Sequence, residues 1–174
     1  ERDVPPFGML YFDDNPENQR QRSRNYGLKF LPKNGPNSAA NVYEKKGKNK
    51  IHIAYFSGEF HQHPVMHLMA PVFLLHNRKD FEVSAFCYGQ EVLDATHKKL
   101  KSCFDQFLEV RSCSDRKIAD LSASLSVDIA VDLSGYTRNG RPGIFGYRAA
   151  PVQVNYLGYP GTMGVEFYDY IIAD

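Results

Sequence analysis

Histidine and proline stand together at positions 63 and 64, at the start of an apolar run. Proline is favoured at the first position of a helix, so the pair predicts a helix that begins at Pro64 with His63 as its cap. The positive end of the helix dipole disfavours an imidazolium there, and a neutral imidazole can accept a proton from a hydroxyl or orient an acceptor group. His63 is therefore a candidate base or positioning residue, and an ordinary capping histidine is the alternative.

Histidines at positions 61, 63 and 67 raise the question of a metal site, because imidazoles four residues apart share a helix face. The sequence has no HExxH pattern, and Pro71 would bend the helix that must hold the ligands. We therefore expect no metal. The apolar spacing instead predicts a stripe of this helix that faces the core. Its members are Val65, Leu68, Met69, Val72 and Leu75.

Two later segments combine glycine with polar groups directly after predicted strands. The segment from Gly158 to Gly164 holds three glycines and one proline, so its amides could approach a phosphate or a peptide, or it could form a tight turn. The segment from Ser134 to Arg141 offers hydroxyls and two guanidinium groups, which suit an oxyanion or a plain polar loop. Neither spells a GxGxxG or Walker A motif, so we expect no dinucleotide or P-loop site.

The elements that must position these segments alternate between short β-branched runs and helical spacings from Lys50 onwards. This alternation predicts an α/β fold with a doubly wound, mostly parallel sheet. The predicted strands are 51–56, 81–88, 107–110, 127–133, 152–157 and 170–173, and the predicted helices are 64–76, 94–104 and 114–125. Ligands of such sheets bind beyond the carboxyl ends of the strands, where the segments described above would lie.

The first 49 residues differ in composition from the rest and are rich in Asn, Pro, Lys and Arg. Asn15 and Pro16 predict the start of a helix, and the region from Lys33 to Lys50 has the composition of an exposed connector. Its lysines could bind phosphate or simply be solvated. We therefore predict two parts: residues 1–49 as an N-terminal helix with an exposed connector, and residues 50–174 as a Rossmann-like lobe.

The composition sets outer limits on function. A chain of 174 residues with 43% hydrophobic and 24% charged residues predicts one globular unit with its own core. The net charge of +1 gives no field for nucleic acid or an anionic membrane, and no apolar stretch approaches the roughly 20 residues of a membrane span. Three cysteines without CxxC spacing favour a reducing compartment, so we expect a cytoplasmic protein without nucleic-acid or membrane partners.

Several runs that cover most of the chain share one further property. They are His63-Pro64 with His67-Leu68-Met69, Gly135-Tyr136-Thr137, Arg148 to Val154, Leu157 to Gly164, and Asp169 to Asp174. Together they resemble the O-linked N-acetylglucosamine transferase family, including its SPINDLY-like bacterial branch. The octapeptide from Leu157 to Gly164 is the most specific part of this resemblance.

The resemblance implies the N-terminal lobe of a GT-B catalytic region, which has two Rossmann-like lobes behind tetratricopeptide repeats. Such enzymes transfer N-acetylglucosamine from UDP-GlcNAc to serine and threonine hydroxyls of proteins, with inversion and without a metal or other cofactor. The chain matches only the first lobe, so we expect it to be inactive alone and to meet the donor through a second lobe. A relative that uses another nucleotide sugar, and a catalytically silent protein-binding lobe, are the alternatives.

The resemblance also implies roles for particular residues. His63 matches the histidine of the family's His-Pro motif and is expected on the acceptor side, where it orients or deprotonates the acceptor. Asp128 matches the position of a second active-site histidine in the animal enzymes, and Asp132 and Ser134 replace polar amides, which argues against a two-histidine mechanism. The residues expected to bind substrate are Pro64, Thr137, Leu157, Gly158, Tyr159, Pro160, Gly161 and Thr162.

Overall fold

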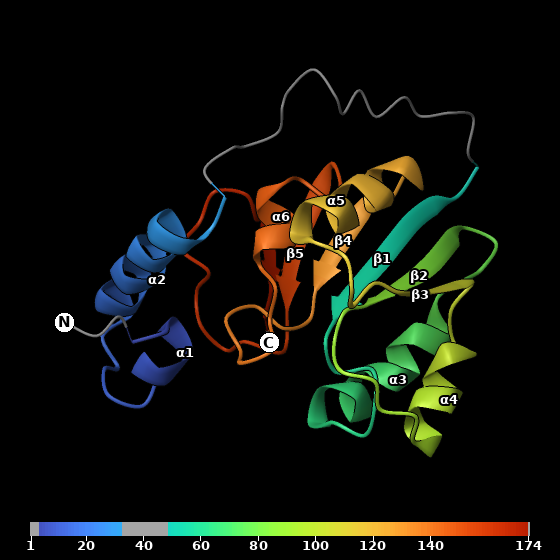
Figure 1. Cartoon of the computed structure of the whole chain (residues 1–174), viewed down its shortest axis with the longest axis horizontal. Coiled ribbons are helices and arrows are strands. Elements are labelled where there is room, and N and C mark those ends of the chain that lie inside the picture. The colour runs from blue at the N-terminus through green and yellow to red at the C-terminus, as the bar shows by residue number, and fades with distance from the viewer. Residues whose placement is uncertain (1–3, 33–48, 174) are drawn as a thin grey trace.

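The computed structural model describes residues 4–32 and 49–173, which form a parallel sheet with helices on both faces (Figure 1). The strands are β1 Ile51–Ser57, β2 Phe81–Cys87, β3 Gln106–Glu109, β4 Ile129–Asp132, β5 Val152–Tyr156 and β6 Tyr170–Ile172. Their order is β3-β2-β1-β4-β5-β6, and every neighbouring pair is parallel. The predicted doubly wound α/β fold is confirmed.

The four predicted helices begin within one residue of their predicted starts, and two short helices accompany them. They are α1 Pro6–Met9, α2 Pro16–Phe30, α3 Pro64–Leu75, α4 Ala95–Lys101, α5 Asp115–Ser124 and α6 Gly143–Gly146. The side chain of Asn15 accepts hydrogen bonds from the first amides of α2, and Ser114 caps α5 in the same way. The sequence did not predict α1 and α6, because one turn of helix is too short to show a period. The connector was predicted from Lys33 to Lys50, and residues 33–48 of it lie outside the described residues.

Strand β1 lies between two hydrophobic cores, because successive side chains of a strand point to opposite faces. Ile53 and Tyr55 belong to the core beneath α3, whereas Ala54 and Phe56 belong to the core beneath α5 and α6. A strand buried on both faces needs a continuous apolar run, and this explains the strong strand pattern in this part of the sequence.

The apolar stripe predicted for α3 is confirmed for Met69, which is buried, and for Val65 and Val72, which pack half-buried against the core, but it is wrong for Leu68 and Leu75. The buried side chains are Met66, Met69 and Phe73, while Leu68 and Leu75 are 63% and 81% exposed. Nearly every position in this helix is apolar, so spacing alone could not decide which face packs on the sheet. The contacts with Tyr55 and the neighbouring strands decide it.

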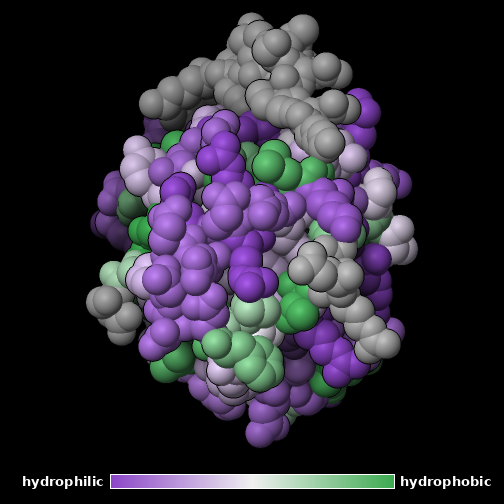
Figure 2. Space-filling view, turned by 90° about the vertical axis from the view of Figure 1, so that its left-hand side faces the viewer, coloured by the Kyte–Doolittle hydropathy of each residue, from purple (hydrophilic) through white to green (hydrophobic). Residues whose placement is uncertain are grey.

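The N-terminal helices pack against loops of the sheet rather than against its faces. Phe7 and Tyr26 contact a small third core that contains Tyr136, Tyr159 and Met163. The outer face on this side of the molecule is mainly hydrophilic, as Figure 2 shows. The division of the chain into residues 1–49 and a lobe of residues 50–174 stays a prediction.

The strand order reverses between β1 and β4. From β1 the chain first builds β2 and β3 on one side, and then crosses back to build β4, β5 and β6 on the other (Figure 1). The loops that leave β1 and β4 therefore separate at this point, where open α/β sheets bind their ligands.

Candidate active site

His63 lies where the loop after β1 enters α3. Its backbone is extended, Pro64 follows at the first helical position, and the Nδ1 atom accepts a hydrogen bond from the Val65 amide at 3.3 Å. The predicted cap is confirmed, and the ring is half-buried rather than sealed in a core.

This cap bond decides which ring nitrogen of His63 can carry the proton. A nitrogen that accepts from a backbone amide has its lone pair in use, so a neutral His63 must carry its proton on Nε2. The ring therefore offers its surroundings an N–H donor at Nε2. It can orient a hydroxyl or carbonyl oxygen, whereas accepting a proton at Nδ1 would require breaking the helix cap.

The loop after β4 is held by the buried carboxylate of Asp132. Its Oδ1 atom accepts hydrogen bonds from the amides of Ser134 at 2.9 Å and Gly135 at 3.0 Å, and its Oδ2 atom accepts from the Tyr168 hydroxyl. Burial raises the pKa of Asp132 against the opposing effect of these donors, and burial likewise raises the pKa of Tyr168. The carboxylate thus sets the backbone of the segment that carries Thr137.

Gly135 needs a glycine for two reasons. Its φ is +53°, and a Cβ atom there would lie 2.6 Å from Cβ of Tyr159. The next residue, Tyr136, is buried, and its hydroxyl donates to the Met163 carbonyl at 3.0 Å. These contacts join the loop after β4 to the loop after β5.

The loop after β5 contains six of the predicted substrate-binding residues, which differ widely in exposure. Leu157, Gly158 and Thr162 are half-buried, Pro160 is exposed, and Tyr159 and Gly161 are buried. Leu157 has a φ of 70°, which is a strained conformation for a residue with a side chain. Gly158 lies directly against the Leu133 carbonyl, so its lack of a Cβ serves packing between neighbouring strands.

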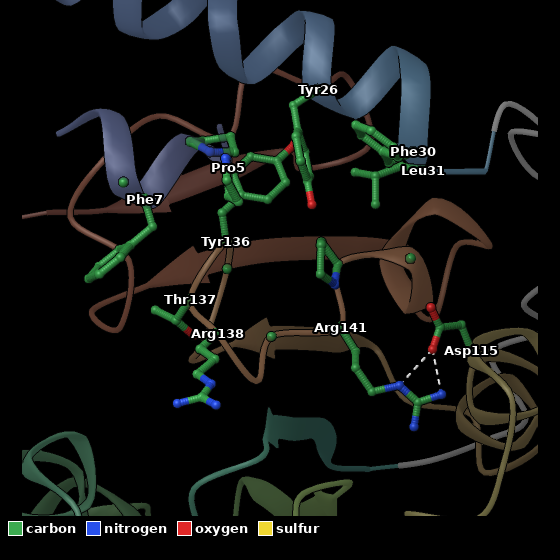
Figure 3. Close-up of a pocket in the computed structure, with 16 residues that line it drawn as sticks. Pro5, Phe7, Tyr26, Phe30, Leu31, Asp115, Tyr136, Thr137, Arg138 and Arg141 are labelled. Atoms are coloured by element: carbon green, nitrogen blue, oxygen red, sulfur yellow. Dashed lines mark hydrogen bonds and ion pairs between the residues drawn. The ribbon is translucent and has the colours of Figure 1, made fainter. Parts of the chain in front are cut away.

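A pocket of about 560 Å³ lies between the N-terminal helices and the loop after β4 (Figure 3). Tyr26 and Tyr136 form part of its wall, and Thr137 and Arg138 lie at one side. Arg141 is held by an ion pair in which its Nε donates to Asp115 at 2.7 Å, while Arg138 points away from this pair. Thr137 is the predicted site residue that lines this pocket; His63 and the residues 157–162 lie outside it.

The structure also connects the loops on the two sides of the point where the strand order reverses. The Asn139 side-chain amide donates to Oε1 of Glu59 at 2.7 Å, and the ring of His61 lies 5.9 Å from that of His63. Neither Glu59 nor Asn139 was singled out in the sequence, because a contact across 80 residues leaves no local pattern.

Asp128 does not lie at the candidate site, and its correspondence to a histidine of the animal enzymes stays a prediction. This residue precedes β4, and its carboxylate accepts from the His52 amide at the start of β1, so it lies at the amino edge of the sheet. It cannot occupy a position beside His63, which lies beyond the carboxyl end of β1.

Among residues 4–32 and 49–173, no group of three or more metal-binding side chains could hold an ion. In the same ranges, no helix is long and apolar enough to cross a membrane.

Comparison with known proteins decides the family. Residues 30–174 match glycosyl transferase family 41. The chain belongs to this family.

Relatives within family 41 carry names that state an activity. The chain is 38% identical over 135 residues to the probable UDP-N-acetylglucosamine–peptide N-acetylglucosaminyltransferase SEC of Arabidopsis thaliana, and this covers 76% of the chain but 14% of that protein. It is 36% identical over 138 residues to the corresponding transferase of Caenorhabditis elegans, covering 78% of the chain and 12% of the relative. The chain thus spans only a small part of these family 41 proteins.

A solved structure of the family also resembles the chain. A mutant of the Thermobaculum terrenum O-GlcNAc transferase superposes with a TM-score of 0.81 at 25% sequence identity. The superposition covers 97% of the chain and 32% of that structure. The superposition therefore includes both the N-terminal helices and the sheet.

Proposed function

We propose that this chain is the acceptor-side, N-terminal lobe of the catalytic region of a protein O-GlcNAc transferase. The longer enzyme would move N-acetylglucosamine from UDP-GlcNAc to serine and threonine hydroxyls with inversion, and without a metal. The observation that carries the proposal is the family 41 match over residues 30–174, which spans the whole sheet together with His63 at its carboxyl edge. The names of the relatives support the donor and the peptide acceptor.

In the proposed reaction, the acceptor hydroxyl attacks the anomeric carbon from the side opposite UDP. A bond forms between the hydroxyl oxygen and this carbon while the bond to the diphosphate breaks, and UDP leaves with the electron pair. His63 contributes by donating from Nε2 to an oxygen of the acceptor, which holds the acceptor in line. Thr137 and the loop from Leu157 to Thr162 would line the acceptor and sugar side of the cleft.

The departing diphosphate needs cationic groups and helix amides. We assign these to a second lobe, so this chain alone should bind donor weakly and should not turn over. Calorimetry of the chain with UDP is expected to show no tight binding. A sub-micromolar dissociation constant would contradict this assignment.

The free thiols of Cys87, Cys103 and Cys113 favour a reducing compartment, and we propose the cytoplasm.

The function is tested in the longer natural protein that contains this chain. Release of nucleoside diphosphate is measured with a serine-containing peptide and, in separate reactions, UDP-GlcNAc, UDP-glucose and GDP-fucose. We expect acceptor-dependent release that is fastest with UDP-GlcNAc. Faster release with another donor would indicate a different sugar, and peptide binding without release from any donor would indicate a silent binding lobe.

A further inference from the structure

Arg138 and Arg141 belong to the same loop after β4, but only one of them is neutralised. The Arg141 guanidinium forms an ion pair with the Asp115 carboxylate, in which Nε donates at 2.7 Å. Arg138 is exposed, and no carboxylate in the described part of the chain forms an ion pair with it. The loop therefore presents one positive charge that no neighbouring side chain compensates.

This charge lies at the rim of the pocket beside Thr137. Both Thr137 and Arg138 line the pocket of about 560 Å³, and apolar and aromatic residues of α1 and α2 form its opposite wall (Figure 3). In that wall the ring of Tyr26 meets the ring of Tyr136 edge to face at 5.3 Å, so the surface is well packed. The Arg138 guanidinium points away from α2 and from Asp115 in Figure 3, which leaves it accessible to a ligand.

The charge of the pocket favours an anionic ligand. The charged residues that line it are two arginines and one aspartate, Arg138, Arg141 and Asp115, which leave one net positive charge. A guanidinium matches the geometry of a carboxylate, to which it can donate two parallel hydrogen bonds. An apolar wall nearby reduces the screening of such a pair by water, and it disfavours a second cation.

The pocket adjoins the loop that carries His63. Asn139, the residue after Arg138, donates from its side-chain amide to Glu59 at 2.7 Å. Glu59 in turn contacts His61, whose ring lies 5.9 Å from that of His63. An extended chain spans about 3.3–3.6 Å per residue, so residues a few positions from a hydroxyl at His63 can reach Arg138.

We propose that Arg138 is a specificity-determining residue that binds an acidic side chain of the acceptor polypeptide, close in sequence to the modified serine or threonine. This inference rests on the proposed function, because it names the class of acceptor that the site selects. The carboxylate of the acceptor accepts from the Arg138 guanidinium, and adjacent parts of the acceptor lie along the aromatic wall. No bond is made or broken at Arg138, so its effect is on the choice between acceptors.

The test compares acceptors within one enzyme, the longer natural protein that contains this chain. One glutamate is moved through the positions that flank the serine of a peptide, and each peptide has a match with glutamine at the same position. We expect kcat/KM for the best glutamate peptide to exceed that of its glutamine match by about fivefold, the upper range for an exposed ion pair. The preference should fall as salt is added, because ions screen exposed charges.

Charge reversal separates recognition from a structural role. The wild-type enzyme should prefer glutamate to lysine at the best position, and Arg138→Glu should prefer lysine to glutamate. Each ratio is measured within one enzyme, so a general loss of activity or of folded protein cancels. Arg116→Gln removes an exposed arginine of α5 that does not line the pocket, and this matched control should keep the wild-type preference.

Two results of the enzyme assay would overturn the proposal. One is a wild-type enzyme that shows no preference for glutamate over glutamine at any flanking position. The other is an active Arg138→Glu enzyme that keeps the wild-type preference for glutamate over lysine.

Binding to this chain gives a second measurement that needs no donor and no turnover. Proton–nitrogen correlation spectra follow the Nε–H signal of Arg138, which is assigned by its absence in Arg138→Gln. The chain is titrated separately with the glutamate peptides, their glutamine matches, UDP and inorganic phosphate. We expect at least one glutamate peptide to shift the signal more than its glutamine match.

The outcomes of this titration distinguish the sources of the anion. A signal that responds to UDP or phosphate but to no glutamate peptide would assign Arg138 to the donor and overturn the proposal. A signal that responds to none of them would also overturn it. A selective response to glutamate peptides, combined with an enzyme that is inactive with every donor, would count against the proposed function instead.

Discussion

Glu59 and Asp132 are carboxylates at the same edge of the sheet, just beyond β1 and at the end of β4, yet they have opposite surroundings. Asp132 is fully buried and accepts from two backbone amides and the Tyr168 hydroxyl. Glu59 is partly exposed, and its carboxylate accepts only from side chains, those of His61 and Asn139. The comparison teaches that the buried carboxylate holds the backbone of its own loop, whereas the partly exposed one links side chains of two loops.

The largest expected difference between the two regions is in stability. Asp132→Ala leaves the amides of Ser134 and Gly135 and the Tyr168 hydroxyl buried without acceptors, which should lower the free energy of unfolding by about 3 kcal/mol. Glu59→Ala is expected to cost less than about 1 kcal/mol, because its partners can reach water. Urea unfolding of this chain measures both. Equal losses would break the comparison.

The second expected effect is smaller and more specific: protonation of Asp132 makes the stability of the fold depend on pH. Its folded-state pKa is raised above the ordinary value of 3.8, so the folded state binds more protons than the unfolded state there. The contribution of Asp132 to stability is therefore fully present below pH 3.8 and is lost as pH rises through the raised pKa.

Asp132→Asn removes this dependence, because its amide oxygen can still accept from both backbone amides. Across that pH range, the free energy of unfolding of the variant should rise relative to that of the wild type by up to about 1.4 kcal/mol for each pH unit. The measurement is the free energy of unfolding from pH 4 to pH 8. A difference that stays constant with pH, or shrinks as pH rises, would contradict the raised pKa.

Tyr168→Phe sharpens the account of the buried region. The change removes one hydrogen bond to Asp132 but leaves the two amides in place, so we expect a loss of about 1 kcal/mol in unfolding free energy. Tyr170→Phe is the matched control, because Tyr170 is 65% exposed and should show no measurable change. If the two variants have the same free energy of unfolding, the Tyr168 hydroxyl does not stabilise the fold through Asp132.

The smallest expected effect concerns the link between the loops after β1 and β4. Asn139→Ala removes an exposed hydrogen bond to Glu59 and should lower the free energy of unfolding by only about 0.5 kcal/mol. Amide hydrogen exchange should nevertheless speed up in residues 58–62 and 134–141. Unchanged exchange in both segments would show that this bond does not connect the loops.

Much of the fold could be predicted from the sequence because its signals are local. The β-branched runs predicted each strand to within a few residues, and Asn15 and His63 predicted helix starts that the structure confirms. A capping residue acts on amides two or three positions away, so its effect is visible in a short stretch of sequence. The rotation of α3 was not predictable in this way, because its apolar residues allow more than one buried face.

The sequence alone determined the alternating strands and helices, and with them the edge of the sheet at which we expect a ligand to bind. Only the tertiary structure decided which polar side chains meet there: it moved Asp128 to the opposite edge, buried Asp132 beneath Tyr168, and joined Glu59 to Asn139 and His61. The physical reason is range. Strand and helix signals act between neighbours along the chain, whereas burial and hydrogen bonding between loops depend on segments that the parallel sheet brings together from far apart.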